Sequence, residues 1–248
     1  MKVIFHPDFY QVYSDDPASE QGRMEAVMDV IESGVELVTA VPATEEDIAA
    51  VHTKEHIKSV RQDGLYPIAS LAAGGAIQAA VFGLNEPCFG LIRPPGHHAS
   101  TASSWGFCYF NNMAIAIGFL KRKKRIQRAC ILDIDLHYGD GTVDALGDCE
   151  YVTIYNSATQ DRERCLNEIT REMENCRADI IGISAGFDNH EDDWGGVYKT
   201  EDYYEIGKKV RKAALRCGGG CFGILEGGYN HKVLGNNVLA LIKGLSKI

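Results

Sequence analysis

Short apolar runs alternate with longer helical patterns along the whole chain, and this alternation constrains the fold more than any other feature. Seven runs are rich in β-branched and aliphatic residues, and several lack the polar alternation of a half-exposed strand. They span residues 3–5, 37–41, 88–92, 129–133, 151–155, 179–184 and 221–225. Because strands that alternate with helices pair in parallel, we expect an α/β fold with helices on both faces of a mostly parallel sheet.

Helical patterns fill the segments between these runs. Met24, Val27, Met28 and Ile31 share one helix face, and Thr44 precedes three acidic residues as a helix N-cap does. Further helices are expected near 68–82, 111–121, 162–175, 201–216 and 232–243. The sequence contains no internal repeat, low-complexity linker or change of composition, so residues 1–248 are predicted to form one domain.

The composition limits the class of partner. The chain has 34 acidic and 25 basic residues, a net charge of −9, which disfavours a broad contact with nucleic acid or an anionic membrane. The basic run 121–125 (KRKKR) is interpreted as the solvated end of a helix. No run approaches the roughly 20 apolar residues of a membrane helix, and no signal peptide is expected. Eight scattered cysteines without a CxxC pair indicate reduced thiols and a cytoplasmic location.

Four polar, glycine-containing segments each follow one of the predicted strands directly. They are 93–98 (RPPGHH), 133–140 (DIDLHYGD), 185–188 (AGFD) and 226–229 (EGGY). The carboxyl ends of parallel strands share one edge of a sheet, and ligands bind there in open α/β folds. We therefore expect these four segments to meet in space and to form one site.

The second of these segments has the spacing of a metal site. Asp133, Asp135 and His137 alternate with two apolar residues, so Asp135 and His137 lie on one face if the backbone is extended. Asp188, after another strand, is placed to supply a third ligand. Two carboxylates and one imidazole leave positions open for water and substrate, as a catalytic zinc site requires, and the same donor set accepts Fe²⁺.

The other polar residues suit proton transfer and carbonyl polarisation. His97 and His98 follow a stiff Pro-Pro-Gly turn, and adjacent histidines suit proton transfer better than chelation of one ion. Asp133 and Asp140 are the carboxylates available to orient them. Tyr229 follows two glycines, and its hydroxyl is suited to donate a hydrogen bond to a carbonyl oxygen.

An apolar slot leading to the metal is expected from Trp105, Gly106 and Phe107. Together with the segments above, the chain resembles the histone deacetylase superfamily, which includes metal-dependent deacetylases of acetyl-lysine, acetylpolyamine amidohydrolases and acetoin-utilisation proteins. The resemblance is carried by RPPGHHA at 93–99, GFCYFNN at 106–112, DIDLHYGDGT at 133–142, SAGFD at 184–188 and EGGYN at 226–230.

The resemblance implies an arginase/deacetylase-like three-layer fold around an eight-stranded, mostly parallel sheet. It implies Zn²⁺ bound by Asp135, His137 and Asp188, with a structural K⁺ near the 133–137 backbone. By the same resemblance, the remaining site residues take the family's roles. These are the histidine pair His97 and His98 with Asp133 and Asp140 behind them, the carbonyl-polarising Tyr229, and Gly106 and Phe107 beside the acyl chain. The implied activity is hydrolysis of the amide of an acetylated amine, either acetyl-lysine or an acetylpolyamine.

Two stretches depart from the family. The segment 53–92, between His52 and Arg93, is short where longer relatives carry a loop at the substrate rim. Residues 156–160 (NSATQ) lack the aromatic residue and the Pro-Gly loop that form the opposite wall of the channel. The resulting hypothesis is a wider, shallower mouth, completed by a neighbouring subunit of a homo-oligomer.

Two other functions remain open on the same fold. A binuclear manganese ureohydrolase needs more metal-facing acids, such as one two residues after Asp188, where this sequence has His190. A non-catalytic protein that binds acyl-lysine needs none of the catalytic residues, yet every one proposed above is present. Both functions are therefore disfavoured relative to amide hydrolysis.

Overall fold

The seven predicted apolar runs form seven strands in the computed structural model, which describes residues 1–157 and 159–246. The strands are β1 (Lys2–Phe5), β2 (Glu36–Thr39), β3 (Cys88–Gly90), β4 (Ala129–Asp133), β5 (Val152–Asn156), β6 (Ile180–Ala185) and β7 (Gly220–Leu225). They form one sheet in the order β2-β1-β3-β7-β6-β4-β5, and every neighbouring pair is parallel. The α/β fold is confirmed; the sheet of the described residues has seven strands, one fewer than the resemblance implies.

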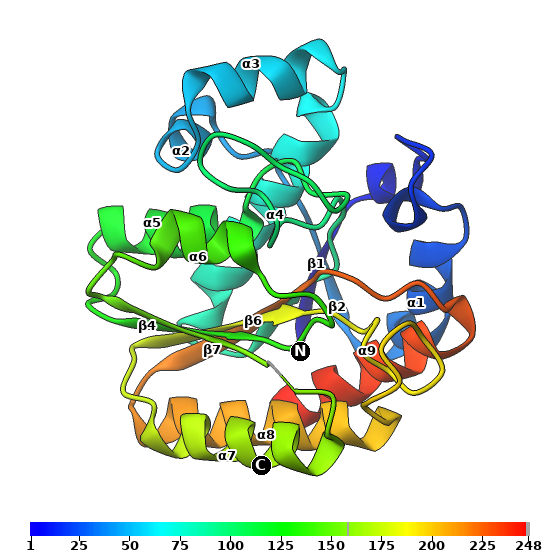
Figure 1. The fold of residues 1–248 in the computed structure, drawn as a ribbon, viewed down its shortest axis with the longest axis vertical. Helices are drawn as coiled ribbons and strands as arrows, with labels where there is room; N and C mark the ends of the chain where they lie inside the picture. Colours follow the sequence, from blue (N-terminus) through cyan, green and yellow to red (C-terminus); the bar gives the residue numbers. More distant parts are fainter. Residues whose placement is uncertain (158, 247–248) are drawn as a thin grey trace.

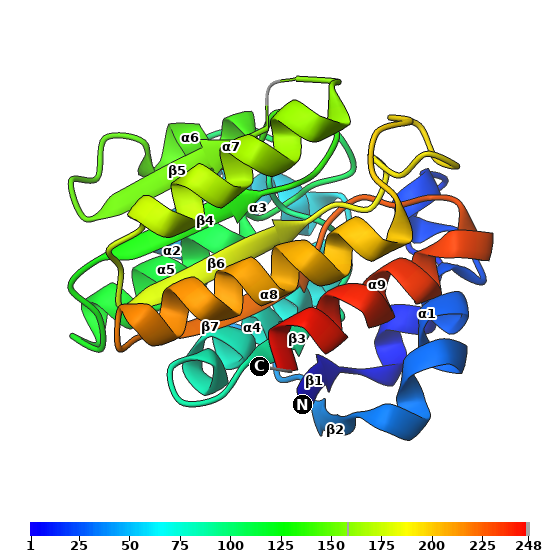
Figure 2. The ribbon, with the colours of Figure 1, turned by 90° about the horizontal axis from the view of Figure 1, so that it is seen from below.

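Helices cover both faces of this sheet. Figure 1 shows α4, α5 and α6 on one side of the strands and α7 and α8 on the other, and Figure 2 shows α7, α8 and α9 side by side across the second face. The helices are α1 (Arg23–Ile31), α2 (Glu45–Ala49), α3 (Lys54–Gln62), α4 (Tyr66–Gly83), α5 (Asn112–Arg122), α6 (Asp140–Leu146), α7 (Arg162–Asn175), α8 (Thr200–Arg216) and α9 (His231–Ser246). Short 3-10 helices are η1 (Pro7–Tyr10), η2 (Pro17–Ser19) and η3 (Glu32–Gly34).

The burial of the strands follows their sequence. All residues of β3, β4, β6 and β7 are buried, because these strands lie inside the sheet and are covered on both faces. The edge strand β2 is largely exposed. The eight cysteines are all free thiols in this structure.

Helix α4 corrects one expectation. By length and composition it is apolar enough to cross a membrane, whereas the sequence was expected to contain no run near that length. In this structure most of α4 is buried: it packs against β1, β3 and β7 of the sheet and against α5. Its all-round apolar character is thus accounted for by its position between the sheet and other helices.

Gly74 lets α4 approach the chain that follows β2. A Cβ at Gly74 would lie 1.8 Å from the carbonyl oxygen of Val41 and 2.5 Å from the amide nitrogen of Ala43. Alanine in place of glycine usually stabilises a helix interior by about 1 kcal/mol. Here we expect Gly74→Ala to lower the free energy of unfolding by about 2 kcal/mol, because backbone has to move.

The matched control is Gly118→Ala in α5, where the new Cβ would meet the flexible end of Arg122 at 3.3 Å and, at an ordinary contact distance of 4.0 Å, Cγ2 of Val51. This variant is expected to gain stability by about 0.5–1 kcal/mol. Urea unfolding of both variants measures the difference. Equal shifts for the two alanines would show that α4 is not held against the 41–43 backbone.

His52 predicts a pH-dependent contribution to stability. Its Nδ1 lies 3.0 Å from the carbonyl oxygen of Ser100, and its Nε2 accepts the amide N–H of Asn111 at 2.9 Å, an arrangement that requires a neutral ring. Burial, with a smaller effect from His56, lowers the pKa of His52 to about 4. As the pH falls, His52 is therefore protonated near pH 6.5 in the unfolded chain but only near pH 4 in the folded chain.

The stabilisation from neutral His52 is fully present above pH 6.5 and is lost as the pH falls towards 4. At about 1.4 kcal/mol per pKa unit the loss amounts to about 3 kcal/mol. An NMR titration of the folded protein measures the pKa directly. We expect the His52 ring to titrate below pH 5, and a midpoint between pH 6 and 7 would refute this.

Candidate active site

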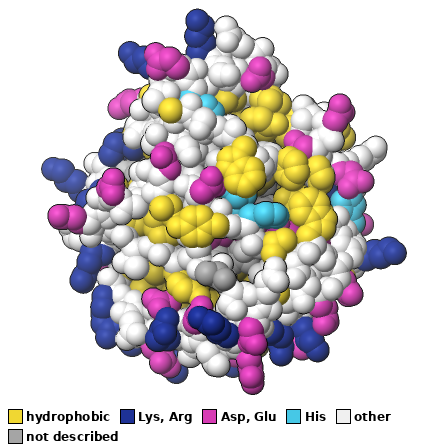
Figure 3. Space-filling view, in the orientation of Figure 1, with side chains coloured by type: hydrophobic (Ala, Val, Ile, Leu, Met, Phe, Trp, Pro, Cys, Tyr) yellow, Lys and Arg dark blue, Asp and Glu magenta, His cyan; other side chains and the backbone are white. Residues whose placement is uncertain are grey.

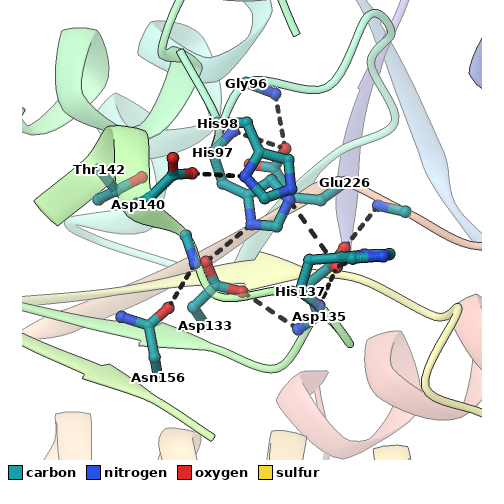
Figure 4. Close-up of polar contacts among 12 residues, drawn as sticks. Gly96, His97, His98, Asp133, Asp135, His137, Asp140, Thr142, Asn156 and Glu226 are labelled. Carbon is teal, nitrogen blue, oxygen red and sulfur yellow. Dashed lines mark hydrogen bonds and ion pairs between the residues drawn. The ribbon is translucent and has the colours of Figure 1, made fainter. Parts of the chain in front are cut away.

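The sheet order places the four polar segments together. The strands that precede them, β3, β7, β6 and β4, are consecutive neighbours, so their carboxyl ends lie side by side. Figure 4 shows most of the side chains that meet there, within hydrogen-bond or ion-pair distance of one another. The structure thereby gathers the candidate residues of all four segments: His97, His98, Asp133, Asp135, His137, Asp140, Asp188 and Tyr229.

The segment after β4 is bent where an extended backbone was expected. The strand ends at Asp133, whose Oδ1 accepts the amide of Asp135 at 3.1 Å. Oδ1 of Asp135 in turn accepts the amide of His137 at 2.9 Å. Short polar side chains that bond to the backbone two residues on favour a turn over a strand. The bends still bring Asp135 and His137 to the same site; Ile134 is buried in the core, whereas Leu136 is only partly buried.

Two glycines allow the neighbouring loops to close on the carboxylates. A Cβ at Gly186 would lie 2.0 Å from Oδ2 of Asp135, and one at Gly227 would lie 2.7 Å from the same oxygen. The amide of Gly227 donates to that oxygen at 3.0 Å. The glycines of the SAGFD and EGGYN motifs are therefore required for the close approach of backbone to these side chains.

Asp135, His137 and Asp188 form a cluster with the geometry of a cation site. Nδ1 of His137 lies 3.2 Å from Oδ1 of Asp135 and 3.1 Å from Oδ2 of Asp188. One ligand atom from each residue lies within 4.8 Å of the others. Among the described residues, Oδ2 of Asp188 is buried and makes no hydrogen bond of acceptable geometry. A buried carboxylate oxygen without a hydrogen-bond donor is suited to bind a metal ion.

The electrostatics of this cluster also fit a cation. Burial, together with the charge of Asp135, raises the pKa of Asp188 to about 7. The close contacts with the carboxylates of Asp135 and Asp188 raise the pKa of His137 to about 10. Two buried carboxylates need a positive charge between them, which the imidazolium proton supplies and which a divalent cation with these three ligands would supply instead.

The two adjacent histidines have different partners. His97 places Nδ1 3.0 Å from Oδ2 of Asp133, and its Nε2 lies 3.8 Å from Asp135, so this ring faces the cation site (Figure 4). His98 places Nδ1 2.6 Å from Oδ1 of Asp140. The centroids of the two imidazole rings lie 4.0 Å apart. Each histidine is thus oriented by its own carboxylate.

Their environments push the two pKa values apart. Burial, with a further effect from His97, lowers the pKa of His98 to about 4. Burial acts in the same direction on His97, but the charges of Asp135 and Asp133 outweigh it and raise the pKa of His97 well above its usual value. His98 is therefore neutral at neutral pH and suits a general base, whereas the carboxylates around His97 favour a proton on its ring.

A cavity of about 100 Å³ opens onto these groups. It is lined by Pro95, His97, His98, Trp105, Gly106, Phe107, His137, Trp194, Gly227 and Tyr229. Burial raises the pKa of Tyr229, so its hydroxyl stays protonated and able to donate. The ring of Phe107 meets that of Tyr229 edge-on at 5.9 Å. The predicted substrate-binding residues Gly106 and Phe107 both lie at this cavity.

Trp194 was not anticipated from the sequence. It lies on the loop between β6 and α8, stacks on Tyr229 with ring centroids 4.1 Å apart, and meets His137 edge-on at 6.2 Å. It thus adds an aromatic side chain from the loop after β6 to the lining of the cavity. Of the segment 156–160, Ala158 lies outside the described residues, and none of the others lines the cavity. The only signal for Trp194 was a tryptophan six residues after Asp188.

Glu226 and Asp193 hold backbone amides of the loops that carry the site, and the sequence did not predict this role for either residue. The buried carboxylate of Glu226 accepts the amides of Gly96 and His97 at 2.7 and 3.2 Å, which fixes the loop that carries the histidines (Figure 4). Oδ2 of Asp193 accepts the amide of Tyr229 at 2.8 Å.

On the face of the molecule seen in Figure 3, hydrophobic side chains gather around histidine side chains near the middle.

His190 is engaged away from the cation cluster. Its Nδ1 accepts the amide of Asp192 at 3.1 Å, and its Nε2 lies 3.3 Å from the hydroxyl of Thr200. Within residues 1–157 and 159–246, one group of three metal-ligating side chains is found, the cluster described above. The structure therefore offers no second ligand set for a binuclear ureohydrolase in the part it describes.

Comparisons with known proteins identify the family of the chain. The histone deacetylase domain matches residues 62–163 and 152–245. A probable deacetylase of Methanothermobacter thermautotrophicus is 30% identical, over 98% of this chain and 90% of that protein. A histone deacetylase-like amidohydrolase of Pseudomonas aeruginosa is 28% identical, over 95% of this chain and 77% of that protein.

A solved structure shows the same fold. The crystal structure of the HDA15 HD domain superposes with a TM-score of 0.85 at 22% identity, covering 98% of this chain and 88% of that one. The domain match spans well over half of the sequence, and the archaeal relative aligns along nearly all of it. The chain therefore belongs to the histone deacetylase family.

Proposed function

We propose that this protein is a metal-dependent amide hydrolase that removes the acetyl group from an acetylated amine. The observation that carries the proposal is the Asp135–His137–Asp188 cluster: its two carboxylates are buried, and its histidine lines the cavity that His98 and Tyr229 also line. Relatives named as a probable deacetylase and as an amidohydrolase support the same reaction class.

The cluster would hold Zn²⁺, with Fe²⁺ as the alternative, since two carboxylates and one imidazole accept both. A divalent cation held there would supply polarisation of the substrate carbonyl and a lowered pKa of water. The chain's own residues then move the protons. His98 is neutral and bound to Asp140 through Nδ1, so Nε2 is the nitrogen that accepts the proton of the attacking water.

The remaining steps follow from the same geometry. The hydroxyl of Tyr229 donates to the carbonyl oxygen as negative charge develops on it. His97, held by Asp133 through Nδ1, directs its Nε2 towards Asp135 of the cation cluster. His98 then gives its proton to the departing nitrogen, and acetate and a free amine leave. Phe107 and Trp194 flank the alkyl chain of the substrate.

Acetate release tests the proposal. Metal-free protein is loaded separately with Zn²⁺ and with Fe²⁺ and is given an acetyl-lysine peptide and an acetylpolyamine. We expect release of acetate from at least one substrate with one of the metals, and its loss after addition of a chelator. No release from either substrate with either metal would overturn the proposal, and formation of urea from arginine with Mn²⁺ would favour a ureohydrolase.

A further inference from the structure

We propose that Trp105 is a positioning residue for the His98–Asp140 pair, an inference that rests on the proposed hydrolysis. The indole Nε1–H of Trp105 donates to Oδ2 of Asp140 at 2.8 Å, while Oδ1 of the same carboxylate lies 2.6 Å from Nδ1 of His98. The indole also lies over the His98 ring, with centroids 3.9 Å apart and planes inclined by 33°. One side chain thus contacts both members of the pair.

Asp140 needs such a partner more than its counterpart Asp133 does. The side chain of Asp133, behind His97, is 2% exposed, and its other oxygen accepts the amide of Asp135. The side chain of Asp140 is 43% exposed. A carboxylate this open to water exchanges partners and rotamers unless a second bond holds it. Trp105 supplies that bond and covers one face of His98.

The local backbone is shaped to place the indole there. Gly106 and Phe107 follow Trp105 with φ of 59° and 66°, two successive residues in the left-handed region. A Cβ at Gly106 would lie 2.4 Å from Cδ2 of His98, so this turn closes directly on the edge of the ring. Trp105 itself is 56% exposed, so burial of its apolar surface does not account for its position.

Trp105 also lines the cavity, and one variant separates its role as a cavity wall from its role as a hydrogen-bond donor to Asp140. Trp105→Phe keeps an aromatic wall and removes the N–H donor. We expect kcat for acetate release to fall about tenfold with KM within twofold, the size expected when one charge-assisted hydrogen bond behind a general base is lost. Trp105→Ala, which removes wall and donor together, is expected to raise KM as well.

The Asp140→Ala background provides the matched control. Without the carboxylate the donor has no partner, so Trp105→Phe is expected to change kcat there by less than twofold. Three results would overturn the proposal: unchanged kcat for Trp105→Phe, a rise in KM alone, or an equal tenfold loss in the Asp140→Ala background. Each would leave Trp105 as a wall residue only.

A second readout does not depend on activity. The chain contains two tryptophans, so the metal-free protein gives two indole N–H signals in a ¹H–¹⁵N spectrum, and Trp194→Phe identifies the signal of Trp105. Asp140→Ala is expected to shift the Trp105 signal upfield and to speed its hydrogen exchange. An unaffected signal would overturn the positioning role, whereas a responsive signal in a protein without hydrolytic activity would overturn the proposed function instead.

Discussion

Tyr229→Phe is expected to lower kcat for acetate release by about 100- to 1000-fold, with KM changed little. The hydroxyl donates to an oxygen that becomes negative only as the amide is attacked, and removal of one such donor has effects of this size in other hydrolases. The substitution keeps the ring, so the stacking on Trp194 at 4.1 Å and the contact with Phe107 are preserved. Steady-state kinetics on the better substrate of the panel measures both constants.

His98→Ala serves as the companion variant, with an expected loss of about 100- to 10,000-fold in kcat because the general base is removed. Both variants should bind metal as the wild type does, since neither side chain belongs to the Asp135–His137–Asp188 cluster. Metal content and thermal unfolding check this. Rates within threefold of wild type for both variants would contradict the assigned roles.

Asp188→Asn is expected to have opposite effects on activity and on the stability of the metal-free protein. Loss of one of three ligands should abolish metal retention and lower kcat by at least about 1000-fold. Without metal, however, the variant removes a buried carboxylate that lies against Asp135, and stability should rise by about 1 kcal/mol. The amide of Leu136, which donates to Oδ1 of Asp188 at 3.1 Å, keeps its acceptor in the variant.

Thermal unfolding with and without Zn²⁺ measures this prediction. In the wild type, a cation at 100-fold excess over Kd adds about 3 kcal/mol and raises Tm by about 5–10 °C. In Asp188→Asn, Zn²⁺ should leave Tm unchanged. A variant that is less stable than wild type without metal, or that still gains stability from Zn²⁺, would show that Asp188 is a structural residue rather than a ligand.

The sheet and the gathering of the site were predictable because both depend on local patterns. Unbroken apolar runs in the sequence predicted β4, β6 and β7. Because parallel strands end at one edge of a sheet, Asp133, Asp188 and Tyr229 could be predicted to lie together. Helices α3 and α6 were not predicted. The first is mostly polar, with only His56, Ile57 and Val60 buried, so its apolar periodicity is weak although most of its residues are good helix formers. The second begins in a motif with two glycines and an aspartate, which have low helix propensity.

What the sequence did not predict depends on contacts between distant segments. Trp194 lines the cavity because the loop after β6 brings it onto the ring of Tyr229. The spacing of residues within that loop does not predict this contact. The bond between Trp105 and Asp140 joins residues 35 positions apart. The all-round apolar sequence of α4 is equally ambiguous, since a membrane span and a buried helix share it until the packing against the sheet is known.

The central claim is that Asp135, His137 and Asp188 hold one divalent cation beneath the cavity. Anomalous diffraction from crystals of the metal-loaded protein, recorded at the absorption edge of the bound metal, tests it most directly. The account predicts one strong peak per chain, bounded by Nδ1 of His137 and one oxygen from each aspartate. A peak elsewhere in an active crystal, or none between these three side chains, would contradict it.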